Sequence, residues 1–143
     1  MTSRDFIHKY FGVDDGKQRT CGNIIKDERG NIYSYGWHYP LLFKINGLVF
    51  RNVRGYSNST AKHIAWAYRD DAIDVSVNLY GYYSGPIAGG ILLRNITEWL
   101  SQEIQSISNV MATKKRHNTR IYKSLMDKLQ TLKRDIEIVR AKT

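Results

Sequence analysis

The residues best suited to chemistry begin in a turn rich in glycine, serine and threonine that precedes a predicted helix. This turn offers hydroxyl groups and a lysine in the first helical turn, where unpaired backbone N–H groups favour a phosphate or a carboxylate. Ser and Thr at a helix start more often serve as caps, which is the alternative role. The segment lacks the G-x-x-x-x-G-K-[ST] spacing of a nucleotide-binding P-loop. Capping is the favoured role of these hydroxyl groups, and the candidate residues of an anion site here are Tyr56, Ser57, Ser59, Thr60 and Lys62.

Two histidines suggest a second chemistry, the cleavage of phosphodiesters without a metal. His38 and His63 would act as acid and base, while Lys62 or Arg51 would hold the phosphate. Cleavage of RNA requires a group that deprotonates the 2′-hydroxyl, a group that protonates the leaving oxygen, and a cation for the developing charge. The alternative is one packed histidine and one on the surface. In this hypothesis the catalytic residues are His38, Lys62 and His63; otherwise the chain has none.

Metal and cofactor chemistry is not indicated. The four histidines lack the spacing of metal ligands, and the acidic residues after the predicted helix are typical of the end of an element. The single Cys21 excludes an internal disulfide and a multi-cysteine zinc site. We therefore expect no metal and no cofactor.

Positive charge is concentrated near the C-terminal end of the sequence. The formal net charge is +9; residues 114–143 hold ten Lys and Arg against three Asp and Glu, whereas residues 1–113 hold twelve against ten. Such a segment attracts an anionic partner through steering and counterion release. A solvated basic helix that only keeps the protein soluble is the alternative. The expected phosphate contacts are Lys114, Lys115, Arg116, Arg120 and Lys123.

The sequence offers no membrane signal. No apolar run approaches the roughly 20 residues of a spanning helix, and the first residues do not form the apolar core of a signal peptide. We expect a cytoplasmic protein without a membrane partner.

The elements that must position these residues indicate an α+β fold. Asn46-Gly47 lies between the apolar runs 41–45 and 48–53 and predicts a hairpin with a type I′ turn, which requires positive φ at both central residues. Further strands are expected at 21–26, 31–35 and 73–79, with a short N-terminal helix that ends before Gly12 and a helix over 60–68. The second helix would bury Ala61, Ile64, Ala65 and Tyr68. We expect a small antiparallel sheet of about four or five strands with one short helix after the hairpin.

Residues 94–143 are predicted to form a basic helical region after an α+β domain of residues 1–93. Asn95 is the expected N-cap, with Glu98 completing a capping box. The polar interval 113–119 favours a helical hairpin over one long helix. From Tyr122 on, apolar residues recur three and four apart, as in a coiled coil. This seam packs either within the chain or between two copies, and in a homodimer its interface would be Tyr122, Leu125, Leu129, Leu132, Ile136 and Val139.

Two segments resemble a domain found in small proteins of bacteriophages and other mobile elements. Residues 34–41 (SYGWHYPL) resemble its S-Y-G-x-H segment, and residues 55–63 (GYSNSTAKH) resemble its Y-S-x-[ST]-T-x-K-H segment. The resemblance covers about residues 22–70 and leaves the basic helices outside it. It implies a phage or mobile-element origin and transfers no activity. It also implies that one shared feature, a site or a fold-defining network, includes His38, Tyr56, Ser57, Thr60, Lys62 and His63.

These observations predict a small non-enzymatic phage accessory protein that binds nucleic acid or a host nucleoprotein through a basic surface. An inhibitor of a host defence system such as CRISPR-Cas is one example of this class. The alternative is the metal-independent nuclease described above. A third hypothesis is a virion or scaffold component that assembles through the C-terminal heptads.

Overall fold

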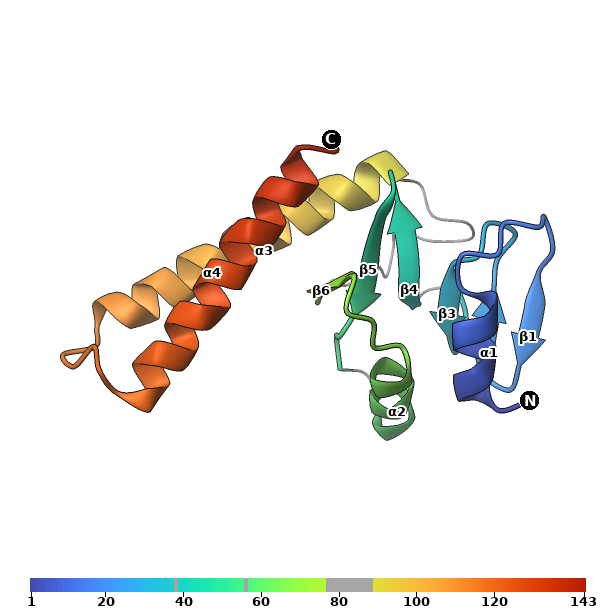
Figure 1. Cartoon of the computed structure of the whole chain (residues 1–143), viewed down its shortest axis with the longest axis horizontal. Coiled ribbons are helices and arrows are strands. Elements are labelled where there is room, and N and C mark those ends of the chain that lie inside the picture. The colour runs from blue at the N-terminus through green and yellow to red at the C-terminus, as the bar shows by residue number, and fades with distance from the viewer. Residues whose placement is uncertain (38, 56, 77–88) are drawn as a thin grey trace. The chain divides into compact units, whose positions relative to one another are not determined.

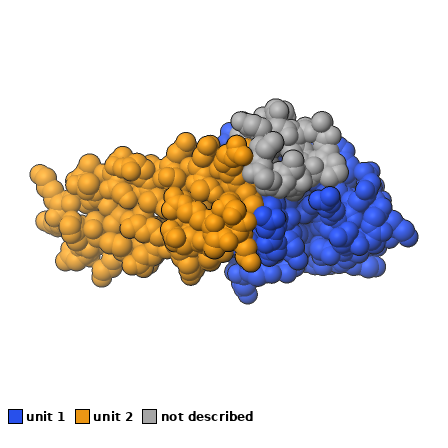
Figure 2. Space-filling view, turned by 90° about the horizontal axis from the view of Figure 1, so that it is seen from above, with its two compact units in different colours: residues 1–89 blue, residues 90–143 orange. Residues whose placement is uncertain are grey.

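The computed structural model describes residues 1–37, 39–55, 57–76 and 89–143. Within these residues the chain divides into two compact units, Met1–Gly89 and Gly90–Thr143, coloured blue and orange in Figure 2. A six-stranded sheet with two short helices, followed by two long helices, gives the predicted α+β class (Figure 1). The elements are α1 (Ser3–Tyr10), β1 (Arg19–Cys21), β2 (Ile24–Lys26), β3 (Ile32–Ser34), β4 (Pro40–Ile45), β5 (Leu48–Asn52), α2 (Asn58–Trp66), β6 (Ala72–Val75), α3 (Gly89–Ala112) and α4 (Arg120–Arg140). The predicted domain boundary after residue 93 falls within α3.

The sheet keeps the order of the sequence, β1-β2-β3-β4-β5-β6. The first four pairs of strands are antiparallel, whereas β5 and β6 are parallel. A parallel pair needs a crossover connection, and α2 supplies it between β5 and β6. The sheet has six strands where about four or five were expected, and it is antiparallel as expected except at the β5–β6 pair. One added strand arises because the expected strand 21–26 divides at Gly22, whose φ of 59° allows a tight turn between β1 and β2.

The central hairpin is confirmed. Asn46 and Gly47 have φ angles of 50° and 81°, as a type I′ turn requires. Phe43 is opposite Phe50 and Ile45 is opposite Leu48. The two phenyl rings stack with 5.5 Å between their centroids and are fully buried, so β4 and β5 lie in the core of the first unit.

Helices α1 and α2 contribute to one apolar cluster with the sheet. Phe6 and Ile7 of α1 and Ala67 at the end of α2 are buried together with Leu42 and Val49 of the central strands. The N-terminal helix is thus confirmed. These contacts hold α2 close to the strands on both sides of it in the sequence.

The predicted inward face of α2 was wrong at three of its four positions. Ala61, Ala65 and Tyr68 are exposed, Ile64 is half-buried against the apolar cluster, and Thr60 and His63 are buried. The prediction followed the aliphatic residues, but a polar side chain can occupy a buried position when it has a hydrogen-bond partner. Both buried polar residues of α2 have one, as described below.

The second unit is a helical hairpin, as predicted. Helices α3 and α4 run antiparallel and are joined by the turn at residues 113–119 (Figure 1). Asn95 is not an N-cap, because α3 begins six residues earlier and its buried stripe already includes Leu93. The Thr97 hydroxyl donates to the Leu93 carbonyl inside the helix. In the described part of the chain no helix has the length and apolar character needed to cross a bilayer.

Candidate functional site

The buried His63 is the centre of a cluster that joins residues 34–41 to residues 55–63. Its Nδ1 lies 2.6 Å from the Ser34 hydroxyl at the end of β3. The imidazole also stacks against Tyr35, at 5.4 Å between centroids, and lies 5.6 Å from Trp66. Tyr35 has a left-handed φ of 60° followed by Gly36, and this turn holds its ring over the histidine.

The geometry favours a neutral imidazole at position 63. Ser34 and His63 are only 1% and 7% exposed, and burial lowers the pKa of His63 below its ordinary value. If the Ser34 hydroxyl donates, Nδ1 is the acceptor and the ring proton is on Nε2. A serine this buried has little access to a substrate, so the pair fits a role in fastening α2 to β3 more closely than a nucleophilic role.

The hydroxyl groups at the start of α2 act as caps. Ser57 Oγ accepts from the Thr60 N–H at 3.1 Å and lies 3.0 Å from the Thr60 hydroxyl. Ser59 and Lys62 are exposed. Tyr56 lies outside the described residues. The capping alternative therefore accounts for two of the five residues of the predicted anion site, and an anion at the other positions stays a prediction.

The parts of the alternative catalytic site do not converge within the described residues. Lys62 is exposed while the neighbouring His63 points into the unit. Arg51 forms a two-pronged ion pair with Asp74, with both N–O distances 2.8 Å, and donates to the Ile64 carbonyl at 3.1 Å. This arginine therefore ties β5, β6 and α2 together. His38 lies outside the described residues.

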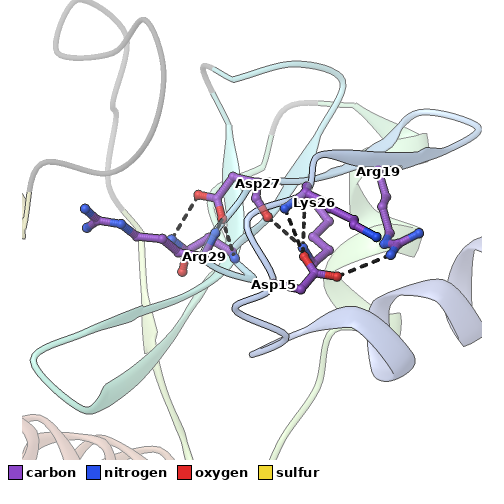
Figure 3. Close-up of polar contacts among 7 residues, drawn as sticks. Asp15, Arg19, Lys26, Asp27 and Arg29 are labelled. Atoms are coloured by element: carbon purple, nitrogen blue, oxygen red, sulfur yellow. Dashed lines mark hydrogen bonds and ion pairs between the residues drawn. The ribbon is translucent and has the colours of Figure 1, made fainter.

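A second polar cluster, which the sequence analysis did not predict, fixes the loops beside β2 (Figure 3). The fully buried Lys26 ammonium donates to Asp15 Oδ1 at 2.8 Å and to the carbonyls of Lys17 and Asp27 at 2.7 and 3.0 Å. The ammonium holds the pKa of the Asp15 carboxyl well below its usual range. All three ammonium donors are used, so Lys26 fastens the loop that precedes β1 to strand β2.

The Asp27 carboxylate organises the loop between β2 and β3. It is fully buried and accepts from the backbone N–H groups of Arg29 and Asn31, the Asn31 amide and the Tyr33 hydroxyl, at 2.9–3.0 Å. In Figure 3 the Arg29 side chain extends away from this carboxylate. Four donors to one carboxylate indicate a satisfied structural anion.

The basic residues predicted to contact phosphate form a group around the turn of the hairpin, and we call this group the basic tip (Lys114, Lys115, Arg116, Arg120 and Lys123). All five side chains are exposed. Within the described part of the chain none of them takes part in an ion pair. No Asp or Glu occurs from Ile104 to Met126. The basic tip is thus a cationic surface in a segment, Ile104 to Met126, that has no acidic residue of its own.

The turn itself is ordered by local contacts. Thr119 is the N-cap of α4, and its hydroxyl oxygen accepts from the Tyr122 N–H at 3.2 Å. The Thr113 hydroxyl donates to the Val110 carbonyl at 2.7 Å near the end of α3. The His117 ring stacks on Tyr122 with 4.4 Å between centroids and 11° between planes. This aromatic pair was not predicted from the sequence.

The predicted oligomer seam lies in the hairpin of a single chain. Leu129, Leu132, Ile136 and Val139 are buried, whereas Tyr122 and Leu125 are half-buried. Packing within the chain accounts for this burial, and a homodimer through these residues stays a prediction.

The described residues contain no group of three or more His, Cys, Asp and Glu side chains arranged to hold a metal ion. Comparison of the chain with protein-family models, with curated proteins and with solved structures found no match. The functional interpretation therefore depends on the residues of this chain.

Proposed function

We propose that this protein binds nucleic acid through the basic tip of its helical hairpin. The observation that carries the proposal is the group of five exposed cations without ion-pair partners in the described chain, in a segment free of carboxylates from Ile104 to Met126. No carboxylate in the described part of the chain pairs with these cations, so an external polyanion is the partner that they suit.

Folding does not explain the concentration of charge. Cations close together repel one another, and among the described residues these five make no ion pair and no buried contact that would offset the repulsion. A phosphate backbone reverses the sign of this interaction and releases its counterions on binding. Arginine can hold one phosphate with two parallel hydrogen bonds, while lysine acts as a mobile point charge.

The biological setting that we propose is a phage accessory role without catalysis. It is supported by the resemblance of residues 22–70 to a domain of small proteins from bacteriophages and other mobile elements. It is also supported by the burial of His63 beside the exposed Lys62, which separates two residues of the alternative catalytic site. A host nucleoprotein, such as a CRISPR-Cas defence complex, would present the same phosphate chemistry as free nucleic acid.

Charge reversal tests the proposal. The triple variant Lys114→Glu, Lys115→Glu and Arg116→Glu should lose most of its affinity for a labelled oligonucleotide, measured by fluorescence anisotropy in EDTA at low salt. The matched control reverses three exposed cations of the first unit and has the same net charge: Arg4→Glu, Lys9→Glu and Lys17→Glu. Affinity that falls equally in both variants would mean that only net charge matters and would refute a site at the tip.

A further inference from the structure

A flat aromatic surface, formed by His117 and Tyr122, lies in the same turn as the cations of the basic tip. The rings of His117 and Tyr122 are nearly parallel, at 11°, with 4.4 Å between centroids. Tyr122 is half-buried at the start of the apolar seam, whereas His117 is exposed. One face of the imidazole is covered by the tyrosine; because His117 as a whole is exposed, the opposite face is the one left for a ligand.

The position of this stack is fixed by the backbone. The Thr119 cap bonds directly to the Tyr122 N–H, so the tyrosine ring is anchored in the first turn of α4. The adjacent Ile121 is 65% exposed, so the first turn of α4 also presents an aliphatic side chain. The backbone of Tyr122, on whose ring His117 stacks, is thus fixed at the start of α4.

Cations flank the stack in the sequence, with Lys115 and Arg116 before His117 and with Arg120 and Lys123 after it. Proteins that bind single strands combine these two features: a cationic track for the backbone and an aromatic face on which an unpaired base stacks. In a duplex both faces of each internal base are already covered by neighbouring bases, so an exposed protein ring finds no free base face on which to stack.

We infer that the basic tip binds single-stranded nucleic acid in preference to duplex, with an unpaired base stacked on the open face of His117. This inference rests on the proposed function and names its substrate class. Sequence preference is weak, because every base has an aromatic face and the stack offers no pattern of hydrogen bonds.

The test compares a single strand of about 15 nucleotides, within the range of known site sizes, with its duplex at the same salt concentration. Fluorescence anisotropy is measured for the wild type, His117→Ala and His117→Phe, with circular dichroism to verify that the hairpin remains folded. Stacking predicts that His117→Ala weakens single-strand binding by about fivefold or more and leaves duplex binding unchanged. The phenylalanine variant keeps an aromatic face without any charge and should retain single-strand affinity.

Two results would overturn the inference while leaving the proposed function intact. The first is equal weakening of single-strand and duplex binding by His117→Ala, since this would mean that the ring only supports the fold of the turn. The second is a phenylalanine variant as weak as the alanine variant. A wild-type protein that binds neither probe refutes the proposed function, and this inference with it.

Discussion

Replacement of Lys26 by methionine tests the reasoning about the buried polar cluster in the first unit. The ammonium is fully buried and has three acceptors within 3.0 Å: the Asp15 carboxylate and the carbonyls of Lys17 and Asp27. Methionine fills much of the same volume but donates to none of them. Loss of one partner from a fully buried ion pair costs about 3–5 kcal/mol, and each unsatisfied buried acceptor about 1–3 kcal/mol.

The expected loss of stability is smaller than these values, because the Asp15 side chain is 29% exposed and water can replace part of its lost interaction with Lys26. We therefore expect Lys26→Met to lower the free energy of unfolding by about 2–4 kcal/mol, measured by urea denaturation with tryptophan fluorescence. The control is Lys17→Met, which removes an exposed ammonium and leaves the carbonyl that Lys26 uses; its effect should stay within about 0.5 kcal/mol. A loss below about 1 kcal/mol for Lys26→Met would refute the view that this ammonium fastens the loops, since that equals one ordinary hydrogen bond.

Three further predictions concern stability. The Lys26 ammonium depresses the pKa of Asp15 in the folded state, so the stability that the Asp15 carboxylate contributes is present above its usual pKa of 3.8 and is lost as the pH falls below that value. Thermal melts between pH 7 and pH 2 should therefore show a smaller loss of stability in acid for Asp15→Asn than for the wild type. Gly30→Ala should destabilise the first unit by about 2 kcal/mol or more, because φ is 92° and the new Cβ would lie 2.5 Å from a backbone nitrogen. The control Gly47→Ala has a φ of 81° but open space around the new Cβ, so it should cost only about 1 kcal/mol in the same urea titration. In the second unit Leu132→Ala should cost about 2–5 kcal/mol by loss of buried volume, and an equal effect of the exposed Ile121→Ala would contradict the assigned seam.

The parts of the fold that could be predicted depend on local chemistry. Asn46-Gly47 specifies its turn because only a few residue types accept positive φ at both positions. The hairpin of α3 and α4 follows from apolar periodicity on both sides of a polar interval. The exposure of the basic tip follows from five charged side chains that the seam has no place to bury.

The parts that could not be predicted depend on contacts between distant segments. The parallel pairing of β5 and β6 is decided by where α2 packs, and no pattern within either strand encodes it. The bond between Ser34 and His63 joins residues 29 positions apart and reverses the expected burial of α2. Sequence spacing also gave no sign that Lys26 and Asp27 are buried, because charged residues are almost always exposed unless they find partners elsewhere in the fold.

The salt dependence of binding tests the central claim most directly. Each phosphate contact with a single strand contributes a slope of about −0.7 to the plot of log affinity against log salt concentration. If all five cations of the basic tip make a contact, the wild-type slope is about −3.5. The double variant Lys115→Gln and Arg116→Gln should then reduce its magnitude by about 1.4. An unchanged slope in that variant, or affinity independent of salt, would contradict nucleic-acid binding at the tip of this hairpin.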